Sequence, residues 1–252
     1  MTESQDDGFR LMKVAATKRI SAGMLRLRLT GRDLARFDTF ANLHLRLYIA
    51  ADQAELRQHP TSGAITCRAT SGGRFDMRYY TISDIDAQAG WLDIDFVLHE
   101  RAGPACDFAR KARPGDLCVI SGPCGRSVKP AARYLLAGDE TALPAIARIA
   151  RSLKPEATGQ ILIRSENPMP CALATPGSMG IRWFTSDETA FFRAAVEEAI
   201  SGVRPGIDDH FIWIAGEAAD CAAFVPRLDP IRKARRINVP YWRRHAEKEL
   251  QE

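Results

Sequence analysis

A change in the pattern of hydrophobic residues near residue 130 constrains the fold of this chain more than any other feature. Before it, short segments alternate apolar and polar residues, as strands with one buried face do. After it, strand-like and helix-like segments alternate, which is typical of an open, largely parallel α/β sheet. At 252 residues the chain is long enough for two domains. We therefore expect a boundary around 127–132, with domains over 8–128 and 129–252.

The first half predicts a small antiparallel barrel. Turn-forming groups such as Ser71-Gly72-Gly73 and Pro114-Gly115-Asp116 separate its strands, and several short strands at this spacing favour a barrel. One helix is expected after Gly103-Pro104, in ACDFARKAR, before Pro114 stops it. The expected strands are 24–30, 43–49, 79–83, 92–99 and 117–123.

The second half predicts a nucleotide-binding type of α/β domain. A short apolar strand, 133–138, runs into DETALPAIARIARSL, whose apolar residues recur at helical spacing. Further strands are expected at 160–164, 181–184 and 210–215, with a helix at 189–200.

Composition excludes several classes of function. The net charge of +4 is modest, and the basic residues near the C-terminus have too few aromatic neighbours to predict nucleic-acid binding. No apolar run approaches the roughly eighteen residues of a membrane span, and MTESQDDGF lacks the apolar core of a secretory signal. The six cysteines form no CxxC pair, so no zinc, iron–sulfur or dithiol site is expected. We expect a cytoplasmic monomer without a resident metal.

The segment LLAGDETALPAIARI, 135–149, is the first candidate ligand site. A hydrophobic strand ends at Gly138 and a polar turn opens a helix, whose N-terminal N–H groups suit a phosphate. Thr141 offers a hydroxyl to a pyrophosphate, and Pro144 suits the first helical turn. The GxGxxG fingerprint is absent, and the alternative is that Asp139 and Thr141 only cap the helix.

Two further segments have the same strand–turn–helix form. In DFVLHERAGPACDFA, 95–109, a strand ends at His99 and a helix begins near Ala105. His99 is either an extra phosphate donor or an ordinary strand-end histidine. In IAGEAAD, 214–220, a strand ends at a glycine, and this turn and the first one would flank one cleft.

Together these segments resemble the siderophore-interacting proteins, which are flavin- and NAD(P)H-dependent ferric-siderophore reductases of the ferredoxin-reductase-like superfamily. The resemblance rests on RYYT, DFVLH with the following GPA, AGDETALPAIARI, WIAGEA and YWRR, and spans roughly residues 10–245. It implies an antiparallel six-stranded FAD-binding β-barrel followed by an α/β parallel-sheet pyridine-nucleotide-binding domain. That architecture agrees with the periodicity described above.

The resemblance also implies roles for single residues toward FAD. Arg78 would contact the FAD phosphates, and Tyr80 would pack on the flavin–ribityl region. Thr81 would face the N5 and O4 edge of the flavin and is the expected catalytic residue. The other FAD contacts implied are Ser83, Val97, His99, Gly103, Pro104, Ala105 and Cys106.

On the nucleotide and substrate side, the resemblance implies a second group of contacts. Trp242 would lie near the flavin, and Arg243 and Arg244 would form a basic rim for an anionic ferric siderophore, with Arg126 or Lys129 as weaker candidates. Each of these basic residues is equally well explained as a solvated surface side chain. The nicotinamide-nucleotide contacts implied are Gly138, Asp139, Thr141, Pro144, Gly216 and Glu217.

The chain departs from the family pattern at four places. Cys106 stands where the family usually has serine, Phe108 where it has tryptophan, and Ser83 where it commonly has arginine. The GPRG turn of the family appears as GPCGR, which displaces Arg126 by two positions.

Arg164, in ILIRSE, predicts the choice of dinucleotide. Rossmann-type domains that prefer NADH place an acid at the end of the second strand, for the ribose 2′-hydroxyl. An arginine at this position would pair with a 2′-phosphate instead. We therefore expect NADPH to be preferred over NADH.

These features predict an enzyme that reduces a ferric siderophore with NAD(P)H through FAD and releases Fe(II). Electron transfer needs no covalent catalysis, and no nucleophile or general-base pair is evident in the sequence. The alternatives are a general flavin or ferric reductase, an FAD-dependent electron-transfer partner of another protein, and a ferric-siderophore carrier without turnover.

Overall fold

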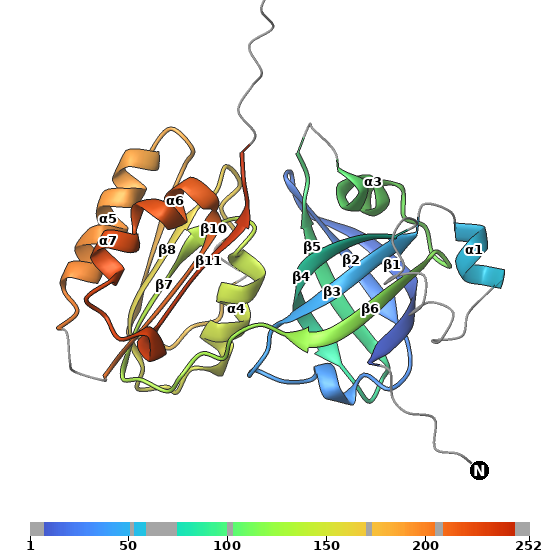
Figure 1. Cartoon of the computed structure of the whole chain (residues 1–252), viewed down its shortest axis with the longest axis horizontal. Coiled ribbons are helices and arrows are strands. Elements are labelled where there is room, and N and C mark those ends of the chain that lie inside the picture. Colours follow the sequence, from blue (N-terminus) through green and yellow to red (C-terminus); the bar gives the residue numbers. More distant parts are fainter. Residues whose placement is uncertain are drawn as a thin grey trace, which may run out of the picture. The chain divides into compact units, whose positions relative to one another are not determined.

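The computed structural model describes residues 8–50, 53–58, 75–99, 103–169, 173–204 and 209–244. The chain divides into two compact units, 1–127 and 128–252. Figure 1 shows the elements of each unit. Within the described residues, no helix has the length and apolar character needed to cross a membrane.

The first unit is a closed antiparallel barrel with the strand order β1-β2-β5-β4-β3-β6, which confirms the predicted six-stranded barrel. Its strands are β1 (Phe9–Ser21), β2 (Met24–Thr30), β3 (His44–Ala50), β4 (Phe75–Asp86), β5 (Trp91–Val97) and β6 (Leu117–Cys124). Its helices are η1 (Ala35–Phe37), α1 (Gln53–Gln58) and α3 (Pro104–Lys111).

Alternate side chains fill the barrel, as period-two patterning requires. Leu45 and Leu47 on β3 face Ile94 and Phe96 on β5 within one core cluster. Helix α3 lies beside β5 at one end of the barrel and buries its small residues, such as Ala105, in that core (Figure 1). The barrel therefore carries the N-terminus of α3 at this end.

The second unit is a parallel five-stranded sheet with the order β11-β10-β7-β8-β9, which confirms the predicted α/β domain. The chain runs outward from the central strand β7 through β8 to β9, and then returns to the other side of β7 with β10. Its strands are β7 (Arg133–Asp139), β8 (Thr158–Arg164), β9 (Met179–Phe184), β10 (His210–Glu217) and β11 (Arg236–Trp242). Its helices are α4 (Leu143–Ser152), α5 (Thr189–Ser201), α6 (Ala218–Ala223), α7 (Val225–Leu228) and η3 (Lys233–Arg235).

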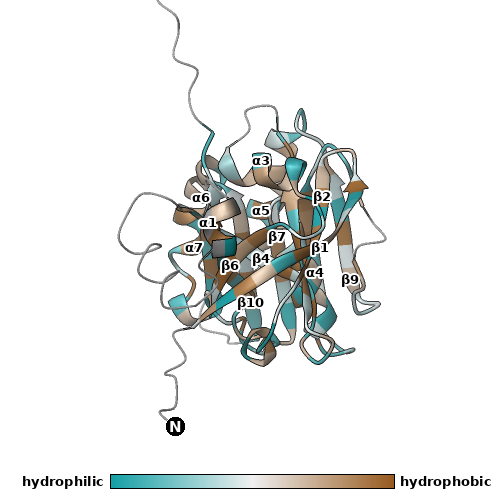
Figure 2. Cartoon of the chain, turned by 90° about the vertical axis from the view of Figure 1, so that its right-hand side faces the viewer, coloured by the Kyte–Doolittle hydropathy of each residue, from teal (hydrophilic) through white to brown (hydrophobic). Residues whose placement is uncertain are grey.

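The strand order reverses between β7 and β10, which makes this the switch point of the sheet. In open α/β sheets the crevice lies at such a switch point, outside the carboxyl ends of the strands. One hydrophobic core, drawn from residues such as Ala137 on β7, Ile214 on β10 and Phe192 on α5, holds these strand ends in place. Figure 2 shows, in brown, the hydrophobic residues along the strands.

Candidate functional site

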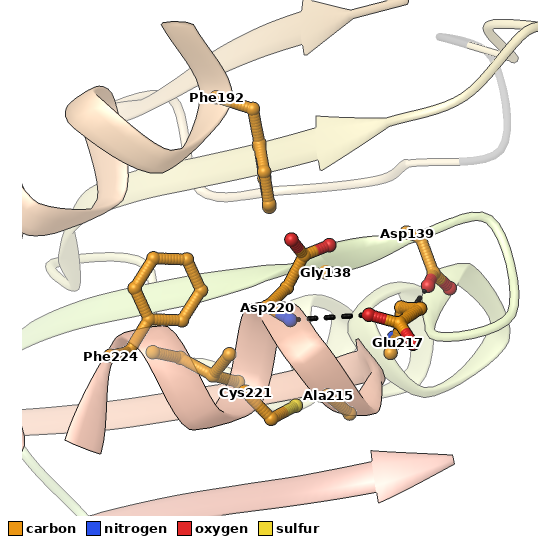
Figure 3. Close-up of a pocket in the computed structure, with 10 residues that line it drawn as sticks. Gly138, Asp139, Phe192, Ala215, Glu217, Asp220, Cys221 and Phe224 are labelled. Carbon is orange, nitrogen blue, oxygen red and sulfur yellow. Dashed lines mark hydrogen bonds between the residues drawn. The ribbon is translucent and has the colours of Figure 1, made fainter. Parts of the chain in front are cut away.

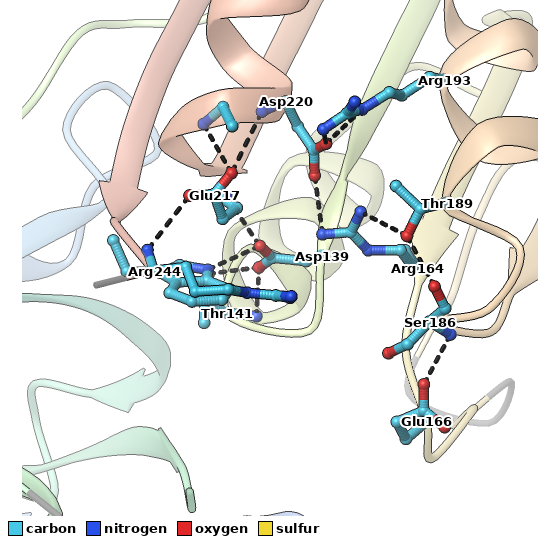
Figure 4. A network of polar contacts seen from close by, with 12 residues as sticks. Asp139, Thr141, Arg164, Glu166, Ser186, Thr189, Arg193, Glu217, Asp220 and Arg244 are labelled. Atoms are coloured by element: carbon cyan, nitrogen blue, oxygen red, sulfur yellow. Dashed lines mark hydrogen bonds and ion pairs between the residues drawn. The ribbon is translucent and has the colours of Figure 1, made fainter. Parts of the chain in front are cut away.

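Asp139, the last residue of β7, is the hub of the polar network at the carboxyl edge of the sheet (Figure 4). Its Oδ1 accepts hydrogen bonds from the backbone N–H of Thr141, at 2.9 Å, and from the Thr141 hydroxyl. Its Oδ2 accepts from the Glu217 N–H at 2.8 Å and from the Trp242 indole Nε1 at 2.7 Å. One buried carboxylate therefore joins the ends of β7, β10 and β11.

Two glycines make this arrangement possible. A Cβ on Gly138 would lie 2.3 Å from the Ala215 carbonyl oxygen, so only glycine lets β7 approach β10 so closely here. Gly216 has a φ of +144°, and its Cβ would lie 2.6 Å from Asp139 Oδ2. Both predicted glycines are thus required by the strand ends themselves.

Glu217 continues the network on the β10 side. One of its carboxylate oxygens caps α6 by accepting from the Ala219 N–H at 2.6 Å, and the other accepts from the Arg244 N–H at 3.2 Å. Burial alone would raise the pKa of Glu217, but the backbone donors of Arg244, Ala219 and Asp220 outweigh it and lower that pKa. Glu217 is therefore an anion that anchors the chain beyond β11.

A small pocket opens at the switch point between β7 and β10 (Figure 3). Gly138 and Asp139 contribute one wall, and the end of β10 with the start of α6 contributes the other. Phe192 reaches into it from α5. The predicted first and third turns thus flank one cleft, as expected from the sequence. Pro144, at the start of α4, is buried.

Arg164 ends β8, as expected, but its guanidinium is already paired. Its Nη2 lies 2.7 Å from Asp220 Oδ2, its Nη1 donates to Thr189 Oγ1 at 3.2 Å, and the residue is only 8% exposed. The other Asp220 oxygen accepts from Arg193 (Figure 4). Direct pairing of Arg164 with a 2′-phosphate stays a prediction, and these contacts argue against it because Arg164 would have to leave Asp220.

In the first unit, the predicted FAD residues gather at the end of the barrel that carries α3. The Tyr80 ring packs on Phe96 with 4.4 Å between ring centroids. Burial raises the pKa of the Tyr80 phenol, with a smaller effect of the nearby Cys106 in the same direction and of Arg78 in the opposite one. Arg78 itself is exposed and lies 3.8 Å from Asp76. Tyr80 thus adjoins both the cation and the start of α3.

The start of α3 fits an anionic group such as the pyrophosphate of FAD. Gly103 is the N-cap and Pro104 follows in the first turn, and no side chain of a described residue caps this end of the helix. A Cβ built on Gly103 would meet no atom of the described residues within 4 Å. The amides of Ala105 and Cys106 point toward this end of the helix, where the dipole is positive. With Arg78 nearby, this set of donors matches a phosphate ligand.

The remaining predicted FAD residues lie in or just beyond the same strands. Val97 ends β5, and His99 follows it with an exposed side chain and a carbonyl that accepts from Arg110 at 2.8 Å. Thr81 is buried and pairs across the ladder with His44. Ser83 is buried too, and its hydroxyl donates to the Asp93 carbonyl at 3.0 Å. The structure gives Ser83 a barrel partner, so any cofactor contact by Ser83 stays a prediction.

The basic residues predicted for the substrate rim come from separate segments. The carbonyl of Pro130, next to Lys129, accepts from Arg235 at the amino end of β11. Arg243 and Arg244 instead follow the carboxyl end of that strand and are exposed, so Lys129 lies at the opposite edge of the sheet. Arg126 is exposed and belongs to the first unit. The roles of these residues toward the substrate stay predictions.

The described residues contain no group of three or more potential metal ligands, and their four cysteines are free. Burial raises the pKa of the Cys118 and Cys221 thiols to about 12 and also raises that of Cys124. These three cysteines stay protonated and unreactive at neutral pH.

A closed six-stranded barrel followed by a parallel sheet with its ligand crevice at the β7/β10 switch point defines a ferredoxin-reductase-like flavoprotein fold. The ferredoxin reductase of a carbazole 1,9a-dioxygenase shares this fold, with a TM-score of 0.67 over 92% of this chain and 68% of that one, at 14% identity. The siderophore-interacting protein SipS from Aeromonas hydrophila is more similar, with a TM-score of 0.79 and 29% identity over 96% of this chain and 94% of that one.

The sequence matches place the chain within one family. Residues 13–127 match the siderophore-interacting FAD-binding domain, and residues 131–245 match the siderophore-interacting protein model. A ferric vibriobactin reductase of Vibrio cholerae is 27% identical over 93% of this chain and 89% of its own length. An NADPH-dependent ferric-chelate reductase of Escherichia coli is 32% identical over 83% of this chain and 82% of its own length. The chain belongs to the siderophore-interacting protein family, as its motifs indicated.

The sequence did not predict two residues of this network. Asp220 pairs with Arg164 and lines the pocket, and Arg193 pairs with the same Asp220 carboxylate. They lie 27 residues apart on α6 and α5, and no motif links them. The hydrogen bond from Trp242 to Asp139 was not predicted from the sequence either. The Asp-x-Thr spacing of Asp139 and Thr141 predicts only the turn at Asp139.

We expect Asp139→Asn to destabilise the protein by about 1–3 kcal/mol, because an amide nitrogen must then face one of the two pairs of donors. Asp229→Asn is the matched control, since Asp229 pairs with Arg236 on the surface and its side chain is 64% exposed. It should cost less than about 1 kcal/mol. The measurement is the free energy of unfolding in urea.

The contact with the indole is tested by combining Trp242→Phe with Asp139→Ala. The two changes should be non-additive, because each removes the same hydrogen bond. Strictly additive effects would show that Asp139 does not hold β11 through Trp242.

Proposed function

We propose that this chain is a flavin-dependent oxidoreductase that passes electrons from NADPH, in preference to NADH, to Fe(III) bound by a siderophore. The observation that carries the proposal is the barrel end where Arg78, Tyr80 and the uncapped N-terminus of α3 meet. This end lies in a chain that matches both siderophore-interacting family models. The relatives named as ferric vibriobactin reductase and NADPH-dependent ferric-chelate reductase support the same activity.

FAD would be held in the first unit. The N–H groups at the start of α3 and the Arg78 guanidinium would bind its pyrophosphate, and the half-buried Tyr80 ring would pack on its aromatic system. When bound, FAD supplies the exchange between a hydride donor and single-electron acceptors. Thr81 is the candidate for contact with its reactive edge. Cys106 lacks the usual serine hydroxyl, but its backbone amide remains available.

NADPH would bind in the second unit at the β7/β10 switch point. The carboxylate oxygens of Asp139 and Glu217 accept hydrogen bonds from backbone N–H groups around the strand ends. These residues would therefore position the walls of the cleft rather than bind the nucleotide directly. Gly138 and Gly216 add no side chains of their own to the cleft. The preference for NADPH is supported by the Escherichia coli relative, whose name gives this donor.

The overall reaction balances with two ferric ions for each NADPH. NADPH gives up two electrons and a proton and becomes NADP⁺, and two ferric siderophores each accept one electron. Fe(II) is softer and more labile than Fe(III), and the hard oxygen ligands of a siderophore hold it less tightly. The exposed Arg243 and Arg244 would attract an anionic ferric siderophore.

A cytoplasmic, monomeric protein is part of the proposal. The free cysteines of the described residues, three of them buried, suit a reducing compartment.

We expect FAD to bind the full chain and Arg78→Gln to weaken that binding about tenfold, because a charge-assisted contact to phosphate is lost. Arg32→Gln is the control. It makes the same charge change just beyond β2, next to the Gly31–Gly90 contact at the other end of β5. Titration of FAD fluorescence with apoprotein measures both affinities. Failure of the unsubstituted chain to bind FAD would defeat the proposal.

Substrate range is tested by anaerobic NADPH oxidation with catecholate and hydroxamate ferric siderophores and with ferric citrate. One siderophore class should give a kcat/KM well above that for ferric citrate. Arg243→Gln should raise KM for an anionic siderophore several-fold, and Lys129→Gln should not, because Lys129 lies at the other sheet edge.

The outcomes of this assay separate the alternatives. Equal rates with every iron complex would indicate a general ferric reductase. Oxidation of NADPH only when a redox protein is added would indicate an electron-transfer partner. Binding of ferric siderophore without turnover would indicate a carrier.

A further inference from the structure

We propose that Arg193 recognises the 2′-phosphate of NADPH and that Arg164 acts on this site indirectly, by neutralising Asp220. The inference rests on the proposed function, since it assumes that a nicotinamide dinucleotide binds at the β7/β10 switch point. It assigns the preference for NADPH to a residue on α5, outside the strand-end turns.

The three charged residues form a compact cluster at the edge of the switch-point pocket. Asp220 and Phe192 both line that pocket, and Arg193 follows Phe192 on α5 (Figures 3 and 4). Arg164 comes from the end of β8, where a Rossmann-type domain reads the 2′ position of the ribose. The cluster therefore lies on the side of the pocket where the adenosine ribose is expected.

The Asp220 carboxylate is fully engaged by the two arginines. Oδ2 lies 2.7 Å from Arg164 Nη2, and Oδ1 lies 2.7 Å from Arg193 Nε and 2.6 Å from Arg193 Nη2. The residue is 5% exposed. An acid that binds a ribose 2′-hydroxyl needs a free oxygen at the cleft, and Asp220 offers none. The cluster therefore lacks the feature that favours NADH.

Arg193 supplies the feature that favours NADPH, which is a set of free N–H donors for a phosphate. Asp220 takes up the Nε and Nη2 edge of its guanidinium, and no contact with another described residue engages Nη1. Its side chain is 40% exposed, compared with 9% for Arg164. Arg193 thus presents free N–H donors to solvent beside the pocket, in a fixed orientation that suits phosphate oxygens.

Because Arg164 also pairs with Asp220, the positive charge of Arg193 is not fully neutralised. Two guanidinium groups and one carboxylate carry a net charge of +1, because Asp220 can neutralise only one of them. If Arg164 were absent, Asp220 would neutralise Arg193, and the attraction for a 2′-phosphate would be lost. Arg164 is therefore a positioning residue that acts through Asp220.

The test compares the binding of adenosine 2′,5′-bisphosphate and adenosine 5′-monophosphate to the full chain by calorimetry. The two probes differ only in the 2′-phosphate. The unsubstituted protein should bind the bisphosphate at least about tenfold more tightly, since one charge-assisted phosphate contact is worth roughly that factor. This ratio should shrink as salt is added.

Arg193→Gln should bring the ratio of the two affinities close to one, and Arg193→Lys should restore part of it. Arg182→Gln, on the exposed face of β9, removes the same charge and should leave the ratio as it is. An unsubstituted protein without a preference for the bisphosphate would overturn the inference. So would a preference that survives in Arg193→Gln.

The readout separates this inference from the proposed function. Nucleotide discrimination is measured without FAD, iron or turnover, so it can hold even if no siderophore is reduced. Conversely, an enzyme that reduces ferric siderophores with unaltered NADPH preference in Arg193→Gln would retain the proposed function and lose this assignment.

Discussion

The Asp139 carboxylate is the interaction on which the ligand side of the second unit depends. It accepts hydrogen bonds from the turn after β7, from the end of β10 and from the indole at the end of β11. A single buried anion with all of these donors fixes three strand ends against one another. Both strand ends need a glycine here, because a side chain on Gly138 would collide with the Ala215 carbonyl oxygen and one on Gly216 would collide with Asp139. The cleft is therefore preorganised by groups whose hydrogen-bonding atoms are already occupied within the protein.

The groups left to bind a ligand are those that the core and the ion pairs leave exposed. In the barrel, α3 buries its small residues in the core and leaves its N-terminal amides without a side-chain cap. In the parallel sheet, Arg164 is buried with Asp220, while Arg193 keeps part of its guanidinium in solvent. Core packing holds the start of α3 in the barrel, and the Asp220 carboxylate holds Arg193 in the sheet. Each of these groups suits a phosphate of one of the two proposed dinucleotides.

Most of the fold could be predicted from the sequence, because burial imposes a period on regular strands and helices. Residues 24–30 form β2 as expected. Strand β1 was missed because paired alanines and a register shift between Val14 and Ala16 break its alternation. Strand β11 was missed because it contains Pro240, which a parallel edge strand tolerates. Of the site, the turn residues were readable from local spacing. The pairing of Arg164 with Asp220 was not, because it joins different elements through tertiary packing alone.

The proposed chemistry couples NADPH oxidation to one-electron reduction of siderophore-bound iron. It is tested by the amount of Fe(II), trapped by a ferrous-specific chelator, for each NADPH consumed under anaerobic conditions with FAD present. We expect two Fe(II) for each NADPH and no Fe(II) when FAD is omitted from the apoprotein. NADPH oxidation without Fe(II), or Fe(II) formation that does not need FAD, would contradict it.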